Sequence, residues 1–118
     1  MVFFNCTTKV NTKEPLFKYP FDKGMAFESD NKASIYRYYI EYNGLNPLWN
    51  KVFHRSLIDT DEDYEKKSYV TNGTDRFQST PIISKAKRIV YLDEVLYFYR
   101  TKNNNASIVH TFKQTAFL

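Results

Sequence analysis

Residues 2–6 form a short, largely apolar run, and this run constrains the fold more than any other local feature of the chain. Strands that are covered on both faces read as continuous apolar runs, because neither face meets water. Residues 88–92 and 95–99 are rich in β-branched and aromatic residues, and they are two further candidate strands with a turn at residues 93–94 between them. The sequence therefore predicts a sheet that contains at least one buried strand.

A helix is predicted over residues 29–42, because apolar side chains recur there at the spacing of one helix face and an Asn-Gly pair follows as a stop signal. A second helix is predicted to begin near Asp75, with Pro81 expected to kink or restart it. Between the two helices, residues 49–54 alternate as in a short strand with one buried face, and residues 55–58 suit a brief helical turn.

The composition is that of one globular domain spanning residues 1–118, since 42% of the residues are hydrophobic and 25% are charged. Aromatic residues alone make up 18%, with ten tyrosines and ten phenylalanines, which exceeds what a small core needs. The surplus rings either fill the core and an interface or line a surface or groove. Sugar-binding sites often use such rings.

The formal net charge of +4 comes from scattered lysines and arginines rather than from a basic run, so no nucleic-acid partner is expected. The single cysteine, Cys6, cannot form an internal disulfide, and the first residues lack the charged start and long apolar core of a signal peptide. A cytoplasmic location is therefore expected. No segment approaches the roughly 18 apolar residues that span a bilayer, so any membrane association would be peripheral, at the inner face.

Three sequence blocks follow one another: Leu-Trp-Asn-Lys-Val-Phe at residues 48–53, Thr-Asp-Arg-Phe at residues 74–77, and Ala-Lys-Arg-Ile-Val-Tyr-Leu-Asp-Glu-Val-Leu-Tyr-Phe-Tyr-Arg at residues 86–100. In this order they resemble the carboxyl-terminal half of family-2 inverting glycosyltransferases, which read W-N-K, then an acidic pair that opens a helix, then a strand that ends in L-Y-x-Y-R. The resemblance implies an α/β fold, namely a partial GT-A-like fold with a small mixed sheet, two or three helices and a mobile carboxyl-terminal segment.

The resemblance also implies half of an active site, because the nucleotide-binding half of such enzymes precedes these blocks and has no counterpart in the 118 residues. A glycine-rich phosphate loop is missing as well, since the chain has three glycines. The chain alone is therefore expected to hold no cofactor or metal. A nucleotide sugar and a divalent cation, Mg²⁺ or Mn²⁺, are expected only with the missing half, and the partner of this half is a glycan or glycolipid acceptor.

Asp75 is the residue to which the resemblance gives the catalytic role. Inverting sugar transfer needs a carboxylate that takes the proton from the attacking acceptor hydroxyl, and the aspartate of the acidic pair does so in the family. Thr74 stands here in place of the first acid. The alternative is that Asp75 only complements the positive end of a helix dipole, which contributes about 0.3–1 kcal/mol.

The resemblance assigns acceptor binding to Trp49, Asn50 and Lys51, because an aromatic face can stack on a sugar ring while an amide and an ammonium bind hydroxyls. The alternative for Trp49 is a core anchor, and for Lys51 a cap on a carboxylate. Arg100 and Ser107 match a region that lies near a mobile loop over the active site in relatives, which suggests a phosphate or lid contact. An arginine at a strand end is otherwise an ion-pair partner or a surface residue.

Residues 61–63 spell D-x-D, which is the metal motif of the family. They follow the W-N-K block and lack a preceding apolar strand, so they predict a solvated acidic loop and no metal site. The alternative to an enzyme half is a non-catalytic module that binds carbohydrate or protein. Such a module could form a homo-oligomer that covers an exposed edge strand.

Overall fold

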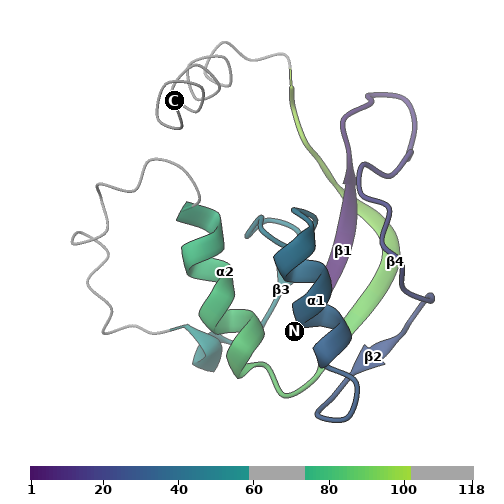
Figure 1. The fold of residues 1–118 in the computed structure, drawn as a ribbon. Helices are drawn as coiled ribbons and strands as arrows, with labels where there is room; N and C mark the ends of the chain where they lie inside the picture. Colours follow the sequence, from purple (N-terminus) through teal and green to yellow (C-terminus); the bar gives the residue numbers. More distant parts are fainter. Residues whose placement is uncertain (59–73, 102–118) are drawn as a thin grey trace.

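The computed structural model describes residues 1–58 and 74–101, and Figure 1 shows how the elements of this part are arranged. It is a small α/β domain, so the predicted fold class is confirmed at this level. The described residues form two α-helices, a four-stranded mixed sheet and one short 3-10 helix. The predicted mobile carboxyl-terminal segment lies outside them. The elements are β1 (Val2–Thr7), β2 (Ala26–Phe27), α1 (Ala33–Glu41), β3 (Lys51–Val52), η1 (Arg55–Leu57), α2 (Thr74–Lys85) and β4 (Ile89–Phe98).

The strand order in the sheet is β2-β4-β1-β3, with β1 and β4 parallel at its centre. β3 is antiparallel to β1 and β2 is antiparallel to β4, and each of these outer strands has two residues. Strands were predicted at both central positions, although their pairing was not, and every side chain from Phe3 to Thr7 is buried. The strand predicted over residues 49–54 is confirmed in its middle as β3, and the predicted helical turn is confirmed as η1. β2 was not expected, because two residues carry no periodic signal.

β4 is one continuous strand, so the turn predicted around Asp93 is wrong. Phe3 lies opposite Tyr91. Two residues later Asn5 lies opposite Val95, so two steps along β1 match four steps along β4. The surplus residues form a bulge, in which the Asp93 carboxylate accepts a hydrogen bond of 2.9 Å from the Tyr91 hydroxyl. The bulge accommodates the polar residues without ending the strand.

Both predicted helices are present, although their bounds differ from those expected. α1 begins at Ala33 rather than at residue 29, because the side chain of Asn31 accepts from the Glu28 amide at 2.7 Å and holds a turn there. α2 is one helix that includes Pro81, so of the two predicted alternatives, a kink or a restart, the restart is wrong. A proline inside a helix costs about 3 kcal/mol. Buried neighbours such as Ile83 hold this helix against the core in spite of that cost.

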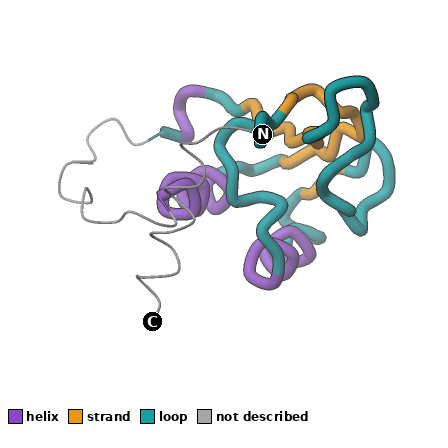
Figure 2. Tube along the Cα trace, turned by 90° about the horizontal axis from the view of Figure 1, so that it is seen from above, coloured by secondary structure: helices purple, strands orange, loops and turns teal. Residues whose placement is uncertain are grey.

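Aromatic rings form much of the core between the sheet and the helices. The ring centroids of Phe3 and Tyr91 lie 5.1 Å apart, and the ring of Tyr19 lies 5.2 Å from each of them. Tyr38 of α1 packs on Phe21 at 5.3 Å. Figure 2 shows the strands gathered on one side with the two helices beside them. Part of the aromatic surplus therefore fills the core, as expected for rings that bury large areas.

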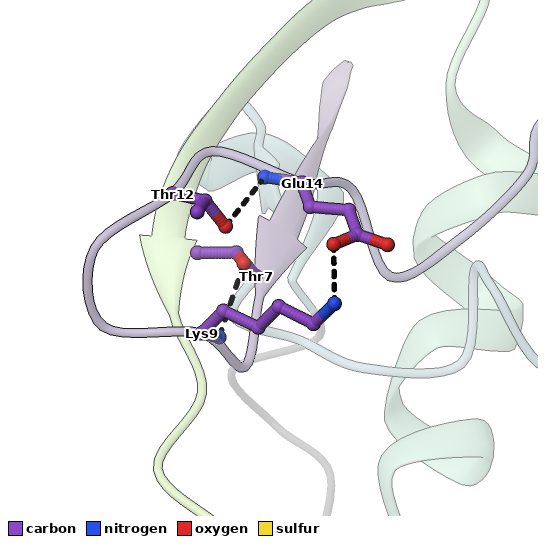
Figure 3. Close-up of polar contacts among 4 residues, drawn as sticks. All are labelled: Thr7, Lys9, Thr12 and Glu14. Atoms are coloured by element: carbon purple, nitrogen blue, oxygen red, sulfur yellow. Dashed lines mark hydrogen bonds and ion pairs between the residues drawn. The ribbon is translucent and has the colours of Figure 1, made fainter.

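The connection that follows β1 is shaped by local polar contacts, which Figure 3 shows. The Lys9 amide donates to the Thr7 hydroxyl at 3.2 Å, and the Glu14 amide donates to the Thr12 hydroxyl at 3.4 Å. The Lys9 ammonium also forms an ion pair with the Glu14 carboxylate. Both of these side chains are 59% exposed, so the ion pair contributes about 0–1 kcal/mol.

Tyr39 links α1 to α2, and its replacement by phenylalanine is expected to lower the free energy of unfolding by about 1 kcal/mol. The Tyr39 hydroxyl donates to the Arg76 carbonyl at 3.0 Å and lies 2.8 Å from the Thr80 hydroxyl. The ring itself, which lies 4.6 Å from the Arg76 guanidinium carbon, is kept in the variant. Denaturant unfolding measures the change. Tyr36→Phe, at an exposed position of the same helix, is the control and should change stability by less than about 0.5 kcal/mol; equal effects would contradict the role of Tyr39.

Candidate functional site

Asn50 is fully buried and fastens the segment that precedes it to the core. Its side-chain amide donates to the Gly44 carbonyl at 2.7 Å and to the Tyr19 hydroxyl at 3.1 Å. The Tyr19 hydroxyl in turn donates to the Gly44 carbonyl at 2.6 Å. These contacts give Asn50 a structural role, and its contact with an acceptor stays a prediction.

Lys51 is buried on β3, with 5% of its surface exposed. Its ammonium donates to the carbonyls of Leu45, at 2.9 Å, and of Pro47. It also donates to the side-chain oxygen of Asn50 at 3.0 Å, so three acceptors face the three N–H groups of an ammonium. Burial lowers the pKa of Lys51 to about 7, and the negative charge of Asp75 acts in the opposite direction. These hydrogen-bond acceptors are carbonyl oxygens, so Lys51 caps no carboxylate of residues 1–58 and 74–101.

Asp75 lies in the first turn of α2, where the sequence predicted it, and is half-buried. The unpaired N–H groups at the start of a helix favour a negative charge there. The charge of Asp75 reaches Lys51, since it counteracts the lowering of the lysine pKa by burial. One turn further along α2, the Ser79 hydroxyl donates to the Asn46 carbonyl at 2.8 Å. α2 is thereby attached to the same segment that Asn50 and Lys51 hold.

The stability of the chain is expected to rise with pH between about 7 and 10 because of Lys51. A lysine pKa that is lowered on folding means that the unfolded chain binds more protons in this range, so the free energy of unfolding increases with pH. The contribution of one group is at most about 1.4 kcal/mol per pH unit. Below pH 7 the Lys51 side chain is protonated in both the folded and the unfolded chain, so this stabilisation is lost.

Denaturant unfolding at pH values between about 7 and 9.5 measures this slope. The amino group of Met1 contributes with the same sign, because burial also lowers its pKa. Tyr91 acts in the opposite sense above this range, because burial raises its pKa to about 12. The part that belongs to Lys51 is therefore the difference in slope between the wild-type chain and Lys51→Met, and equal slopes would contradict the prediction.

Trp49 belongs to a cluster of rings outside the core. Its ring centroid lies 4.5 Å from Tyr97 with an interplanar angle of 17°, and 5.4 Å from Tyr99 with an angle of 25°. The ring centroid of Phe17 lies 6.5 Å from that of Trp49, with an interplanar angle of 23°. Trp49 is half-buried by these contacts, so it is not the core anchor of the alternative reading. The two tyrosines were not singled out as site residues, although strand alternation in Leu-Tyr-Phe-Tyr places them on one face.

Arg100 is exposed just after β4, and it has no hydrogen bond or ion pair with any residue of the ranges 1–58 and 74–101. The ion-pair alternative therefore has no support within the described part of the chain. Its contact with a phosphate stays a prediction. Ser107 and residues 61–63 lie outside the described residues.

An apolar pocket of about 260 Å³ lies beside α2. Its one polar lining residue is Gln78, which follows Asp75 by three positions and therefore lies on the same face of the helix. The other lining residues are Leu48, Phe53, Leu57, Ile58, Pro81 and Ile82. A second hollow, of about 230 Å³, lies at the bulge of β4 and includes Asp93 and Glu94. Within the described residues no three His, Cys, Asp or Glu side chains are grouped as a metal site would require.

The helices in the described part of the chain are too short or too polar to cross a bilayer. Comparisons with known proteins found no family model, no curated protein and no solved structure that matches this chain. The three sequence blocks and the geometry of the residues that they contribute are therefore the features of this chain that point to a function.

Proposed function

We propose that this chain is the acceptor-binding and catalytic-base half of an inverting glycosyltransferase. The observation that carries the proposal is that α2, with Asp75 in its first turn, is hydrogen-bonded through Ser79 to the segment that Lys51 of the Trp-Asn-Lys block also holds. The charge of Asp75 counteracts the lowering of the Lys51 pKa by burial. The two residues come from separate blocks of the sequence, with η1 and residues 59–73 between them. Their proximity supports a common site.

In the proposed reaction the Asp75 carboxylate takes the proton of an acceptor hydroxyl. The hydroxyl oxygen forms a bond to the anomeric carbon of a nucleotide sugar, and the bond from that carbon to the diphosphate oxygen breaks. The bonding electrons leave with the nucleotide diphosphate. The other product is a glycan or glycolipid extended by one sugar with inverted configuration.

Lys51 is a positioning residue in this proposal. Its ammonium holds the carbonyls of Leu45 and Pro47, and these contacts shape the segment to which α2 is attached through Ser79. A change at Lys51 therefore displaces the segment beside Asp75. Stability and acceptor binding are expected to fall together in such variants.

The donor nucleotide sugar and a divalent cation would be held by residues that precede the three blocks in the resembling family. The described residues do not group three metal ligands, so they do not fit a cation site, and no step of the proposed reaction at Asp75 is assigned to a metal. An acceptor half is expected to bind a glycan even when no nucleotide sugar is present. This difference between acceptor and donor binding gives a direct test.

The test is a series of amide NMR spectra of the 118-residue chain during titration with oligosaccharides, and separately with nucleotide diphosphate sugars with and without Mn²⁺. Oligosaccharides are expected to shift the signals of Asp75 and Lys51, and nucleotide sugars are expected to shift neither. Oligosaccharides that leave both signals unchanged would contradict the acceptor site. Metal-dependent binding of a nucleotide sugar would contradict the half-site and assign a donor site to this chain.

A second candidate function is a non-catalytic module that pairs with another copy of itself. The observation that favours it is the exposure of the distal part of β4: Leu96 is 58% exposed and Phe98 is 46% exposed. Within the described residues, β2 pairs only with Ile89 and Val90, so the remaining outer edge of β4 has no strand partner there. Exposed apolar edge strands favour strand pairing between chains. Sedimentation equilibrium would detect a dimer, and a monomer at every concentration would exclude it.

A further inference from the structure

Four rings at the carboxyl-terminal end of β4 form a surface that we call the aromatic ledge: Phe17, Trp49, Tyr97 and Tyr99. We propose that this ledge is a carbohydrate-binding surface on which Tyr97 and Tyr99, backed by Trp49, stack against the apolar face of pyranose rings in an oligosaccharide. Because Trp49 belongs to the block to which the resemblance assigns acceptor binding, this inference rests on the proposed function and extends its acceptor site to Tyr97 and Tyr99. It concerns residues that differ from the catalytic base Asp75 and the positioning residue Lys51.

The rings of the ledge are nearly parallel. The planes of Tyr97, Phe17 and Tyr99 make angles of 17°, 23° and 25° with the indole of Trp49. In the core, by contrast, many ring pairs meet edge to face, such as Phe3 with Tyr19 at 75° and Phe21 with Phe27 at 74°. In a parallel stack each tyrosine covers the indole with one face, so its other face is turned away from Trp49.

The two tyrosines of the ledge are accessible. Tyr97 and Tyr99 are each 40% exposed, while Trp49 and Phe17 are half-buried behind them. Neither tyrosine hydroxyl has a hydrogen bond to another residue of the described part of the chain. The phenol oxygens are therefore available to sugar hydroxyls while the rings offer their faces.

The ledge is held in place by backbone and buried polar contacts. The Tyr99 amide donates to the Thr7 carbonyl at 2.8 Å, which keeps β4 paired with β1 up to the ledge. The Asn5 side chain donates to the Phe17 carbonyl at 2.6 Å and accepts from the Phe17 amide at 3.0 Å. Trp49 directly precedes Asn50, which is fully buried and hydrogen-bonded. Pre-ordered rings lose little entropy when a ligand binds.

The size of the ledge fits a sugar better than a protein. An aromatic side chain presents about 150–250 Å², so the exposed parts of Tyr97 and Tyr99 together offer about 160 Å². A stable protein interface needs about 800 Å² from each partner. Leu96 and Phe98 do not enlarge the ledge, because side chains alternate along a strand and these two point to the opposite face. One or two pyranose rings match the available surface.

The chemistry of a pyranose matches the ledge as well. One face of the sugar ring carries C–H bonds, and aromatic faces carry the negative part of the ring quadrupole, so the two attract each other. Hydroxyl groups at the edge of the sugar can then bond with the phenol oxygens. A neutral or weakly acidic oligosaccharide is the expected ligand class, and the exposed Arg100 that follows Tyr99 favours an acidic sugar over a basic one.

Trp49 is the single tryptophan of the chain, so its fluorescence reports on the ledge alone. The experiment is a fluorescence titration of the full 118-residue chain with three probes: a β-linked glucose hexamer, an N-acetylglucosamine hexamer and a uronic-acid hexamer. At least one probe is expected to shift the emission with saturation in the millimolar range or tighter. Tyr97→Ala and Tyr99→Ala are each expected to weaken the affinity at least tenfold, and Tyr97→Phe less than threefold.

Tyr36→Ala removes a tyrosine of similar exposure, 37%, from α1 and serves as the matched control that keeps wild-type affinity. Aromatic NMR signals of Tyr97 and Tyr99 in the wild-type chain give a readout that needs no variant, in case an alanine variant fails to fold. The inference is overturned if no probe shifts the emission, if the tyrosine signals do not move, or if Tyr36→Ala weakens binding as much as Tyr97→Ala. Because these signals differ from those of Asp75 and Lys51, either proposal can fail alone.

Discussion

Asp75→Asn is expected to lower the rate of sugar transfer by about 10²–10⁴, because removal of a general base typically costs that much. Asparagine keeps the size and can still accept hydrogen bonds at the start of α2, so the fold is expected to persist. The loss should appear in kcat, with little change in KM for the acceptor. Under the proposed function, the measurement is the steady-state rate of transfer from a nucleotide diphosphate sugar to a glycan, made on a protein that joins this chain to a donor-binding half.

Asp30→Asn is the matched control for Asp75→Asn. Asp30 is an exposed carboxylate before α1 and is not part of the candidate site, so its replacement should leave the rate unchanged. Unchanged turnover in Asp75→Asn would leave Asp75 with the helix-dipole role alone.

Lys51→Met is expected to lower the free energy of unfolding by about 3 kcal/mol, because it leaves three buried acceptors without a donor and each such group costs about 1–3 kcal/mol. The loss of a buried charge offsets part of this cost. Domains have about 5–15 kcal/mol of stability in total, so the change is large. Denaturant unfolding near pH 6, where Lys51 is an ammonium, measures it.

Lys85→Met is the matched control for Lys51→Met, because Lys85 is an exposed lysine in the last turn of α2. Its replacement should change stability by less than about 0.5 kcal/mol. If Lys51→Met were as stable as the wild-type chain, the burial of the ammonium would outweigh its three hydrogen bonds. Lys51 would then lose its assignment as the residue that shapes the segment beside Asp75.

Periodic patterns of sufficient length predicted most of the fold. The run at residues 2–6 became the buried β1, and the pattern at residues 29–42 became α1, because burial of an apolar face dominates the choice of structure over such lengths. The bulge in β4 and the continuity of α2 through Pro81 were not predicted. Both features depend on contacts with strands and helices that are distant in sequence, so no local sequence pattern predicts them.

Some features of the candidate site were predicted from the sequence, and others were not. The place of Asp75 in the first turn of a helix followed from local signals before it. The burial of Asn50 and Lys51 did not, because polar residues of these types are usually exposed. Their acceptors are main-chain carbonyls, which every residue carries, and a sequence does not reveal which of them remain unpaired.

By itself the sequence determined the α/β class, the places along the chain where the two central strands lie, and the three blocks that carry the family resemblance. Only the tertiary structure decided that the charge of Asp75 reaches a buried Lys51 and that Trp49 is stacked with Tyr97 and Tyr99. The physical reason is the range of the forces involved. Periodicity records which side of an element meets water, whereas hydrogen bonds, ring stacking and charge pairing depend on distances between residues that only the folded chain brings together.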